Sequence, residues 1–228
     1  ISRLGTMRAL SHATSTELSA LLVGPRLRGS AVTPRHLLFG GYVVSLTPPG
    51  APRLPNGIET SAEAGIGQRV TVGGGALRVG RQVLEPGPGW NPRPSFTPFH
   101  CFAPGPEPQA ELYAGRGAGL TPAGDDLLAG YVAGLVLLHG ETKRAAQLAR
   151  EAAGRTAPLS ATLLRHAASG EVPEPVHVLL ASGDTRPLLA FGHSSGIAWM
   201  RGLVSAGYPL GREREVFGHS QVAAIANR

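Results

Sequence analysis

Eight prolines lie between residues 86 and 108, and they separate two parts of the chain with different hydrophobic patterns. Proline has no backbone N–H and a fixed φ angle, so this segment can form neither a central strand nor a helix interior. Before it, apolar residues alternate between glycine turns, as in strands; after it, they recur at helical spacing. The sequence therefore predicts an α+β protein with a β-rich N-terminal half and a mostly α-helical C-terminal half.

The β-rich half is expected to form a small antiparallel barrel or sandwich, because its strands are short and are separated by glycine turns. Within "RLPNGIET", Asn56-Gly57 predicts a tight turn. Strands are predicted at residues 37–39, 42–46, 69–72, 76–79 and 82–84.

The C-terminal half is expected to hold five helices, two of them at residues 122–139 and 141–154. The other three correspond to "LSATLLRHAASG", "PEPVHVLLASG" and "SSGIAWMRGLVSAG". Gly170 and Gly183 are predicted to end the third and fourth helices. We therefore divide the chain into a β-rich domain (1–85), a proline-rich arm (86–108) and a helical domain (109–228). The arm contains Trp90, Phe96, Phe99 and Phe102, so we expect it to pack against the body of the protein.

Composition and charge exclude several classes of function. The formal charge is +6, but the basic residues are scattered and aromatics make up only 5%, so no nucleic-acid-binding stripe is predicted. The net positive charge remains compatible with small anionic substrates. Cys101 is the single cysteine, and no two histidines share a helix face, so we expect no metal and no cofactor.

Neither a membrane span nor a secretory signal is predicted. The longest apolar run, from Leu127 to Leu138, is shorter than the ~20 residues that a membrane-spanning helix needs. The first residues do not show the pattern of a signal peptide. A lone cysteine fits a reducing compartment, so we expect a cytoplasmic protein.

The stretch "GRGAGLTPAGDD", residues 115–126, predicts a ligand-binding loop at a helix start. Thr121 is expected to cap the helix and Pro122 to be its first residue. Glycines allow close backbone approach, and a helix N-terminus favours an anion. The candidate binding residues here are Arg116, Gly117, Gly119, Thr121 and Gly124.

Asp125 and Asp126 are two of the three aspartates in the chain. The helix dipole stabilises an acidic residue in the first turn by roughly 0.3–1 kcal/mol, which explains one aspartate better than two. The helix that follows is apolar all round and therefore buried, so its carboxylates need a partner. Both aspartates are candidate catalytic residues.

A second motif, "GHSSG" at residues 192–196, fits the G-x-S-x-G elbow of serine hydrolases, with Ser194 as nucleophile. Only about 25 residues separate Ser194 from His219, too few for the units that would carry a triad. The preferred interpretation is a second glycine-lined helix start, with His193, Ser194 and Ser195 as candidate binding residues. Arg165 could also clamp a substrate carboxylate through two hydrogen bonds.

Three stretches, "GRGAGLTPAGDDLLAG", "TAPLSATLLRHAASGE" and "LLAFGHSSGIAWMRG", resemble in this order the AllH family, the small subunit of oxamate carbamoyltransferase. "LPNGIET" is similar to the family's Pro-Asn-Gly turn, which adds Asn56 to the candidates. The resemblance extends from about residue 20 to 206. The chain departs from the family after Gly196, where Ile197 and Ala198 replace an aspartate.

The resemblance implies carbamoyl transfer between carbamoyl phosphate and an acceptor such as oxamate, in purine-derived nitrogen catabolism. It also implies partner subunits of a multi-subunit complex; a homo-oligomer is the alternative. The second hypothesis is a non-catalytic subunit or module that binds a small anion through the same loops. A serine hydrolase is the remote third.

Overall fold

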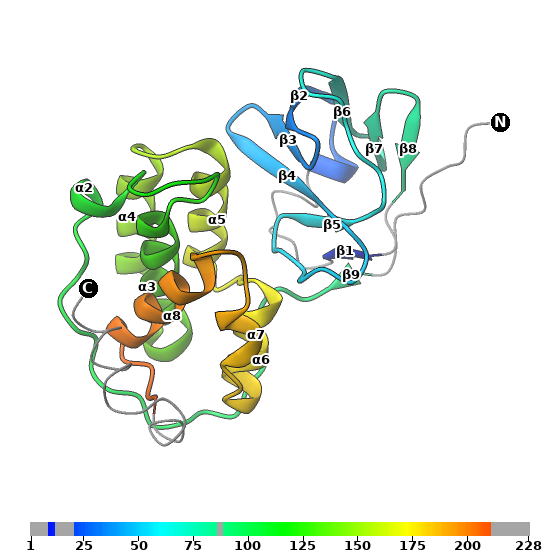
Figure 1. Ribbon diagram of the computed structural model, residues 1–228. Helices are drawn as coiled ribbons and strands as arrows, with labels where there is room; N and C mark the ends of the chain where they lie inside the picture. Colours follow the sequence, from blue (N-terminus) through cyan, green and yellow to red (C-terminus); the bar gives the residue numbers. More distant parts are fainter. Residues whose placement is uncertain (1–8, 12–20, 86–88, 211–228) are drawn as a thin grey trace. The chain divides into compact units, whose positions relative to one another are not determined.

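The computed structural model describes residues 9–11, 21–85 and 89–210 (Figure 1). Strands occupy the N-terminal half and helices the C-terminal half, so the predicted α+β class is confirmed. The chain forms two compact units. The β unit comprises Ile1–Pro94 and Glu171–His177, and the helical unit comprises Ser95–Gly170 and Val178–Arg228.

The β unit is built on one mixed sheet, in which the described residues contribute nine strands in the order β8-β7-β6-β2-β3-β4-β5-β1-β9. Most neighbours are antiparallel, but β4 pairs with β5 and β1 with β9 in parallel. The strands are β1 (Ala9–Ser11), β2 (Leu27–Thr33), β3 (His36–Phe39), β4 (Tyr42–Thr47), β5 (Gly57–Glu59), β6 (Arg69–Gly73), β7 (Ala76–Val79), β8 (Gln82–Leu84) and β9 (Gly89–Trp90).

All five predicted strands are present, but β1, β2, β5 and β9 were not predicted. In β2, Gly29 interrupts the alternating pattern. A Cβ there would overlap the carbonyl of Leu38 on the paired strand β3, so close backbone approach requires glycine. Strand β5 begins at Gly57, directly after a turn at residues 55–56. Because turn residues precede it directly, this short strand could not be recognised from the sequence, although its Ile58 is fully buried.

The helical unit is arranged around α3 (Ala123–His139), which packs against α4 (Thr142–Ala153), α5 (Pro158–Ala168) and α8 (Ser195–Ser205). Four of the five predicted helices lie in this group; the fifth is α6 (Glu174–Ser182), whose residues up to His177 belong to the β unit. Gly170 and Gly183 adopt positive φ angles after α5 and α6, as predicted. The short helices α2 (Ala110–Tyr113) and α7 (Arg186–Leu189) were not predicted, because one turn gives no helical periodicity.

Helices α3 and α8 lie side by side in Figure 1, and glycines bring their backbones together. A Cβ on Gly130 would overlap the carbonyl of Trp199, and a Cβ on Gly202 would overlap the carbonyl of Leu127. A Cβ on Gly134 would overlap the side chain of Ala206. The contact fixes how the N-terminal turn of α8 lies against that of α3.

Parts of the proline-rich arm pack within each unit. In the β unit, the Arg53 guanidinium lies 5.0 Å from the Trp90 ring centroid, and that centroid is 4.9 Å from the His177 ring. In the helical unit, Phe99 meets Tyr208 edge to face at 5.5 Å. The prediction that the arm packs is confirmed for these rings, whereas Phe102 is 58% exposed.

An ion pair between Arg53 and Glu174 joins distant parts of the β unit. The Arg53 Nη2 and Nε atoms donate to Glu174 Oε1 at 2.5 and 3.1 Å, and the Arg53 amide donates to Oε2 at 3.0 Å. In return, the Glu174 amide donates to the Arg53 carbonyl at 2.9 Å. Burial raises the pKa of Glu174, but the Arg53 hydrogen bonds and charge outweigh it, so this pKa lies below its ordinary value.

We expect the β unit to lose stability in acid, and Glu174→Gln to remove part of that loss. A lowered carboxyl pKa stabilises the fold above the unfolded value of 4.5, and this contribution disappears as pH falls through the lower, folded value. Because the pair is partly exposed, the substitution should lower stability at pH 7 by at most about 1 kcal/mol. Hydrogen exchange of the Glu174 amide, measured at pH 7 and pH 3.5, tests this. Equal acid sensitivity in both proteins would contradict it.

Candidate functional site

The glycine-rich loop before α3 has the backbone conformation that its sequence predicted. Gly115, Gly117 and Gly119 have φ angles of 71°, 123° and 93°. At Gly117 a Cβ would lie 2.8 Å from the Ala123 nitrogen, so the loop backbone packs closely against the start of the helix. The helix begins one residue later than expected, at Ala123, and its N-cap is Pro122, without a side-chain cap. Thr121 therefore does not cap the helix, and its hydroxyl is available for another role.

The loop itself uses much of the hydrogen-bonding capacity of the first turn of α3. The Gly124 amide donates to the Arg116 carbonyl at 2.9 Å. The amides of Asp125 and Asp126 donate to the Pro122 carbonyl at 2.9 and 3.1 Å. These three N–H groups are therefore occupied, and an anion would need donors other than these.

Asp125 holds the loop on the helix. Its side chain is 2% exposed. Its Oδ1 accepts the Gly115 amide at 2.7 Å, and its Oδ2 accepts the Thr156 hydroxyl at 2.5 Å. Both oxygens are thus engaged by the protein, which is the pattern of a structural carboxylate.

We expect Asp125→Ala to loosen the loop and destabilise the helical unit. The substitution leaves the Gly115 amide and the Thr156 hydroxyl without their acceptor, which should lower the free energy of unfolding by about 1–3 kcal/mol. Urea denaturation measures the loss, and hydrogen exchange of the Gly115 amide localises it. Thr156→Ser, which keeps a hydroxyl, is the matched control and should stay near wild type. Unchanged exchange at Gly115 in the alanine variant would disprove the role.

Asp126 differs from its neighbour. It is 3% exposed, and its Oδ2 has no hydrogen-bond partner among the described residues. Burial raises the pKa of Asp126 to about 7, although hydrogen bonding from the side chains of Ser195, Thr121 and Trp199 lowers it. The charge of Asp125 raises it further. A carboxyl group with such a pKa can both accept and release a proton near neutral pH.

Two hydroxyl groups flank this carboxyl. The Thr121 Oγ1 and Ser195 Oγ atoms are 3.3 Å apart, and both residues are half-buried. Ser195 is the first residue of α8, and Gly192 turns above it with a φ of 63°. A Cβ on Gly192 would lie 3.3 Å from Ser195 Oγ, so a side chain at this position would crowd the hydroxyl.

We name Thr121, Asp126, Ser195 and Trp199 the carboxyl–hydroxyl cluster. It lies where the starts of α3 and α8 meet, and residues close to it in sequence, such as Gly119 and Ser194, are exposed. Trp199 was not predicted from the sequence. Its position four residues after Ser195, on the same face of α8, was the signal that could have identified it.

The other predicted site residues lie outside the cluster. Arg116, His193 and Ser194 are exposed. On α5, Arg165 Nη2 donates to Thr162 Oγ1 at 3.3 Å. Asn56 is buried in the β unit, where its Nδ2 donates to the Val43 carbonyl and to Ser45 Oγ, each at 2.9 Å.

Two further properties bear on the chemistry. In residues 9–11, 21–85 and 89–210, no three His, Cys, Asp or Glu side chains are grouped as metal ligands. Within the same described ranges, no helix has the length and apolar character to cross a membrane. The triad partners that the hydrolase hypothesis requires, Glu213 or Glu215 with His219, lie outside the described residues.

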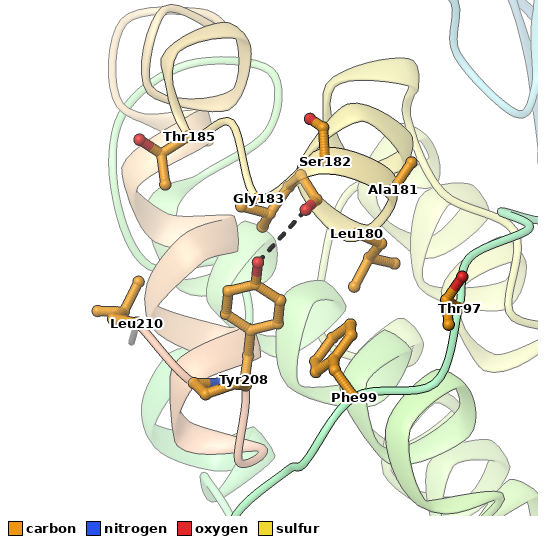
Figure 2. Close-up of a pocket in the computed structure, with 11 residues that line it drawn as sticks. Thr97, Phe99, Leu180, Ala181, Ser182, Gly183, Thr185, Tyr208 and Leu210 are labelled. Atoms are coloured by element: carbon orange, nitrogen blue, oxygen red, sulfur yellow. Dashed lines mark hydrogen bonds between the residues drawn. The ribbon is translucent and has the colours of Figure 1, made fainter. Parts of the chain in front are cut away.

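A cavity of about 320 Å³ lies elsewhere in the helical unit, between the arm, the end of α6 and the segment after α8 (Figure 2). The rings of Phe99 and Tyr208 meet edge to face in it. The Tyr208 hydroxyl donates to the Leu179 carbonyl at 3.3 Å. None of the described residues that line it is charged. These described residues offer no charged group for a phosphate or a carboxylate.

The family model described as oxamate carbamoyltransferase subunit AllH matches residues 113–207. The match begins at the last residue of α2 and ends just beyond α8. It confirms the resemblance over this stretch, which contains all four residues of the carboxyl–hydroxyl cluster. No curated protein and no solved structure matches the chain.

Proposed function

We propose that the chain is a subunit of a carbamoyltransferase and that the carboxyl–hydroxyl cluster is its substrate site. The substrates are carbamoyl phosphate and a small acceptor with an amide and a carboxylate, such as oxamate. One observation supports this most: within the residues that match the AllH family, Asp126 is buried beside two hydroxyl groups, and its Oδ2 has no hydrogen-bond partner in the described part of the chain.

Asp126 takes the role of proton acceptor. An amide nitrogen is a weak nucleophile, so transfer of the carbamoyl group requires removal of its proton as it attacks the carbamoyl carbon. The pKa of Asp126, raised to about 7 chiefly by burial, lets it accept that proton near neutral pH. Asp125 cannot share the role, because both of its oxygens bind the protein.

Thr121 and Ser195 position the reacting groups. Their hydroxyls are able to donate to the carbamoyl oxygen, whose negative charge grows as the nitrogen attacks. The exposed Arg116 side chain, on the glycine-rich loop, supplies positive charge for the phosphate or the carboxylate. Arginine suits both because its guanidinium group forms two parallel hydrogen bonds with either.

The second candidate function is a non-catalytic subunit that binds the same anions. One observation favours it: the amides of Gly124, Asp125 and Asp126 already donate to backbone carbonyls, so the α3 turn offers fewer donors for transition-state charge. In that case another subunit of the complex supplies the chemistry.

Calorimetry and turnover assays test the proposal together. We expect the chain to bind carbamoyl phosphate, and oxamate in its presence, and to form the carbamoylated product and phosphate, alone or mixed with its partner subunits. Binding without a contribution to turnover would establish the non-catalytic function. Absence of binding to carbamoyl phosphate, oxamate and phosphate in every mixture would reject both.

A further inference from the structure

We infer that Ser195, rather than the elbow serine Ser194, is a nucleophile activated by Asp126, and that it carries the carbamoyl group as a covalent intermediate. The inference rests on the proposed function, which it deepens by adding a step. The G-x-S-x-G pattern selects Ser194, whereas the geometry of the folded helical unit selects its neighbour.

The two serines have different surroundings. Ser194 is exposed, lies at the N-cap of α8 and makes no side-chain capping hydrogen bond. Ser195 is half-buried, and its Oγ lies 3.3 Å from Thr121 Oγ1. It is also among the side chains that hydrogen-bond to the Asp126 carboxyl.

Asp126 has the properties of an activating base for this hydroxyl. A serine hydroxyl is a weak nucleophile until a neighbouring group takes its proton. The Asp126 carboxyl is 3% exposed, and its Oδ2 has no partner among the residues that the structure describes. Burial makes its charged form costly, which increases its tendency to accept a proton. No structural bond to Oδ2 has to break for this to occur.

Glycine at position 192 keeps a side chain away from the nucleophile. Gly192, with a φ of 63°, passes above Ser195 Oγ, and any side chain there would begin 3.3 Å from that atom. A substrate carbonyl needs to approach the nucleophile to about 3–3.5 Å. A side chain at position 192 would therefore compete with the substrate carbonyl for the space next to Ser195 Oγ, and glycine avoids this.

In the first step, Ser195 Oγ loses its proton to Asp126 and forms a bond to the carbamoyl carbon. The bond from that carbon to the phosphate oxygen breaks, and phosphate leaves with the electron pair and takes the proton from Asp126. In the second step, the acceptor nitrogen attacks the carbamoyl carbon and gives a proton to Asp126. The bond to Oγ breaks, and Asp126 returns the proton to Ser195. Thr121 donates a hydrogen bond to the carbamoyl oxygen throughout, and Ser195, as the nucleophile, no longer shares that role.

The test uses the full chain and p-nitrophenyl N-methylcarbamate, a reagent that carbamoylates activated serines and releases coloured p-nitrophenol. We expect a burst of about one equivalent of p-nitrophenol in the wild type, and peptide mass spectrometry should locate the methylcarbamoyl group on Ser195. Ser195→Ala and Asp126→Asn should abolish the burst. Ser205→Ala, at the exposed end of the same helix, should leave it unchanged.

Turnover with carbamoyl phosphate and oxamate separates this inference from the proposed function. If Ser195→Ala transfers the carbamoyl group at the wild-type rate, the covalent step is wrong and the proposed function stands. If the wild type labels at Ser195 but never transfers a carbamoyl group in any mixture with partner subunits, the nucleophile is real and the proposed function fails. Labelling at Ser194, or no labelling, would overturn the inference.

Discussion

Asp126→Asn is expected to lower carbamoyl transfer by roughly 10²–10⁴-fold, the usual contribution of a positioned proton acceptor. Asparagine keeps the size and hydrogen-bonding shape of the side chain but cannot take up a proton. Substrate binding should change little, so the loss should appear in kcat rather than in KM. Steady-state kinetics with the complete set of subunits measures it.

The pH profile supplies a second signature of Asp126. With its pKa raised to about 7 by burial, kcat/KM in the wild type should rise with pH through about 7 and then level off, because the deprotonated form is the base. The residual activity of the asparagine variant should lack this rise. Retention of the same rise in the variant would assign it to another group and contradict the role of Asp126.

The Asp126→Asn variant should be less active than the wild type but more stable. Because the pKa of Asp126 is about 7 in the folded chain and 3.8 in the unfolded one, the folded chain holds a proton that the unfolded chain releases. The free energy of unfolding therefore falls as pH rises between these values, by on the order of 1.4 kcal/mol per pH unit. Asparagine removes this penalty, so Asp126→Asn should be more stable than wild type at pH 8 in urea denaturation.

The second large effect is expected at the contact between α3 and α8. Gly130→Ala and Gly202→Ala each place a Cβ against the backbone of the facing helix, and neither backbone can move aside without the helix moving too. Overpacking of this kind costs about 1–3 kcal/mol and sometimes more. The gain of up to about 1 kcal/mol in helix propensity does not offset it. Chemical denaturation measures the difference.

Turnover should fall with stability in these variants. A shift of α8 separates Ser195 from Thr121 and Asp126, whose side chains meet only because the helices are close. Gly154→Ala is the matched control, because its Cβ would meet nothing nearer than 3.8 Å and its φ is −72°. It should leave stability and turnover near wild type. Two stable, fully active variants at Gly130 and Gly202 would show that the helices do not need this contact.

Much of the architecture could be predicted because local chemistry dictates it. The apolar and β-branched residues of "YVVSLT" and the long apolar run after the glycine-rich loop are properties of neighbouring residues, and both elements formed within one residue of the expected bounds. Strand β2 escaped prediction because Gly29 is required by the carbonyl of Leu38, which a local pattern does not contain. Strand β5 escaped prediction because its first residue, Gly57, directly follows a turn at residues 55–56.

The candidate site was predicted only in part. The sequence selected Thr121, Asp126 and Ser195, but it could not distinguish them from Asp125 and Ser194, which stand next to them. Both aspartates fit a first helical turn equally well by pattern. The folded unit separates them, because Asp125 finds the Gly115 amide and the Thr156 hydroxyl. Asp126 instead faces the start of α8, and its Oδ2 has no partner among the residues that the structure describes.

By itself, the sequence determined the α+β class, the glycine-rich loop and the presence of scarce aspartates at the start of a buried helix. It also determined the resemblance to the AllH family, since that depends on strings of residues. The tertiary structure alone decided which residues meet: Ser195 lies 74 positions from Thr121, yet their hydroxyls are 3.3 Å apart. The reason is packing, because Gly130 and Gly202 admit a close helix contact that brings the start of α8 to the start of α3.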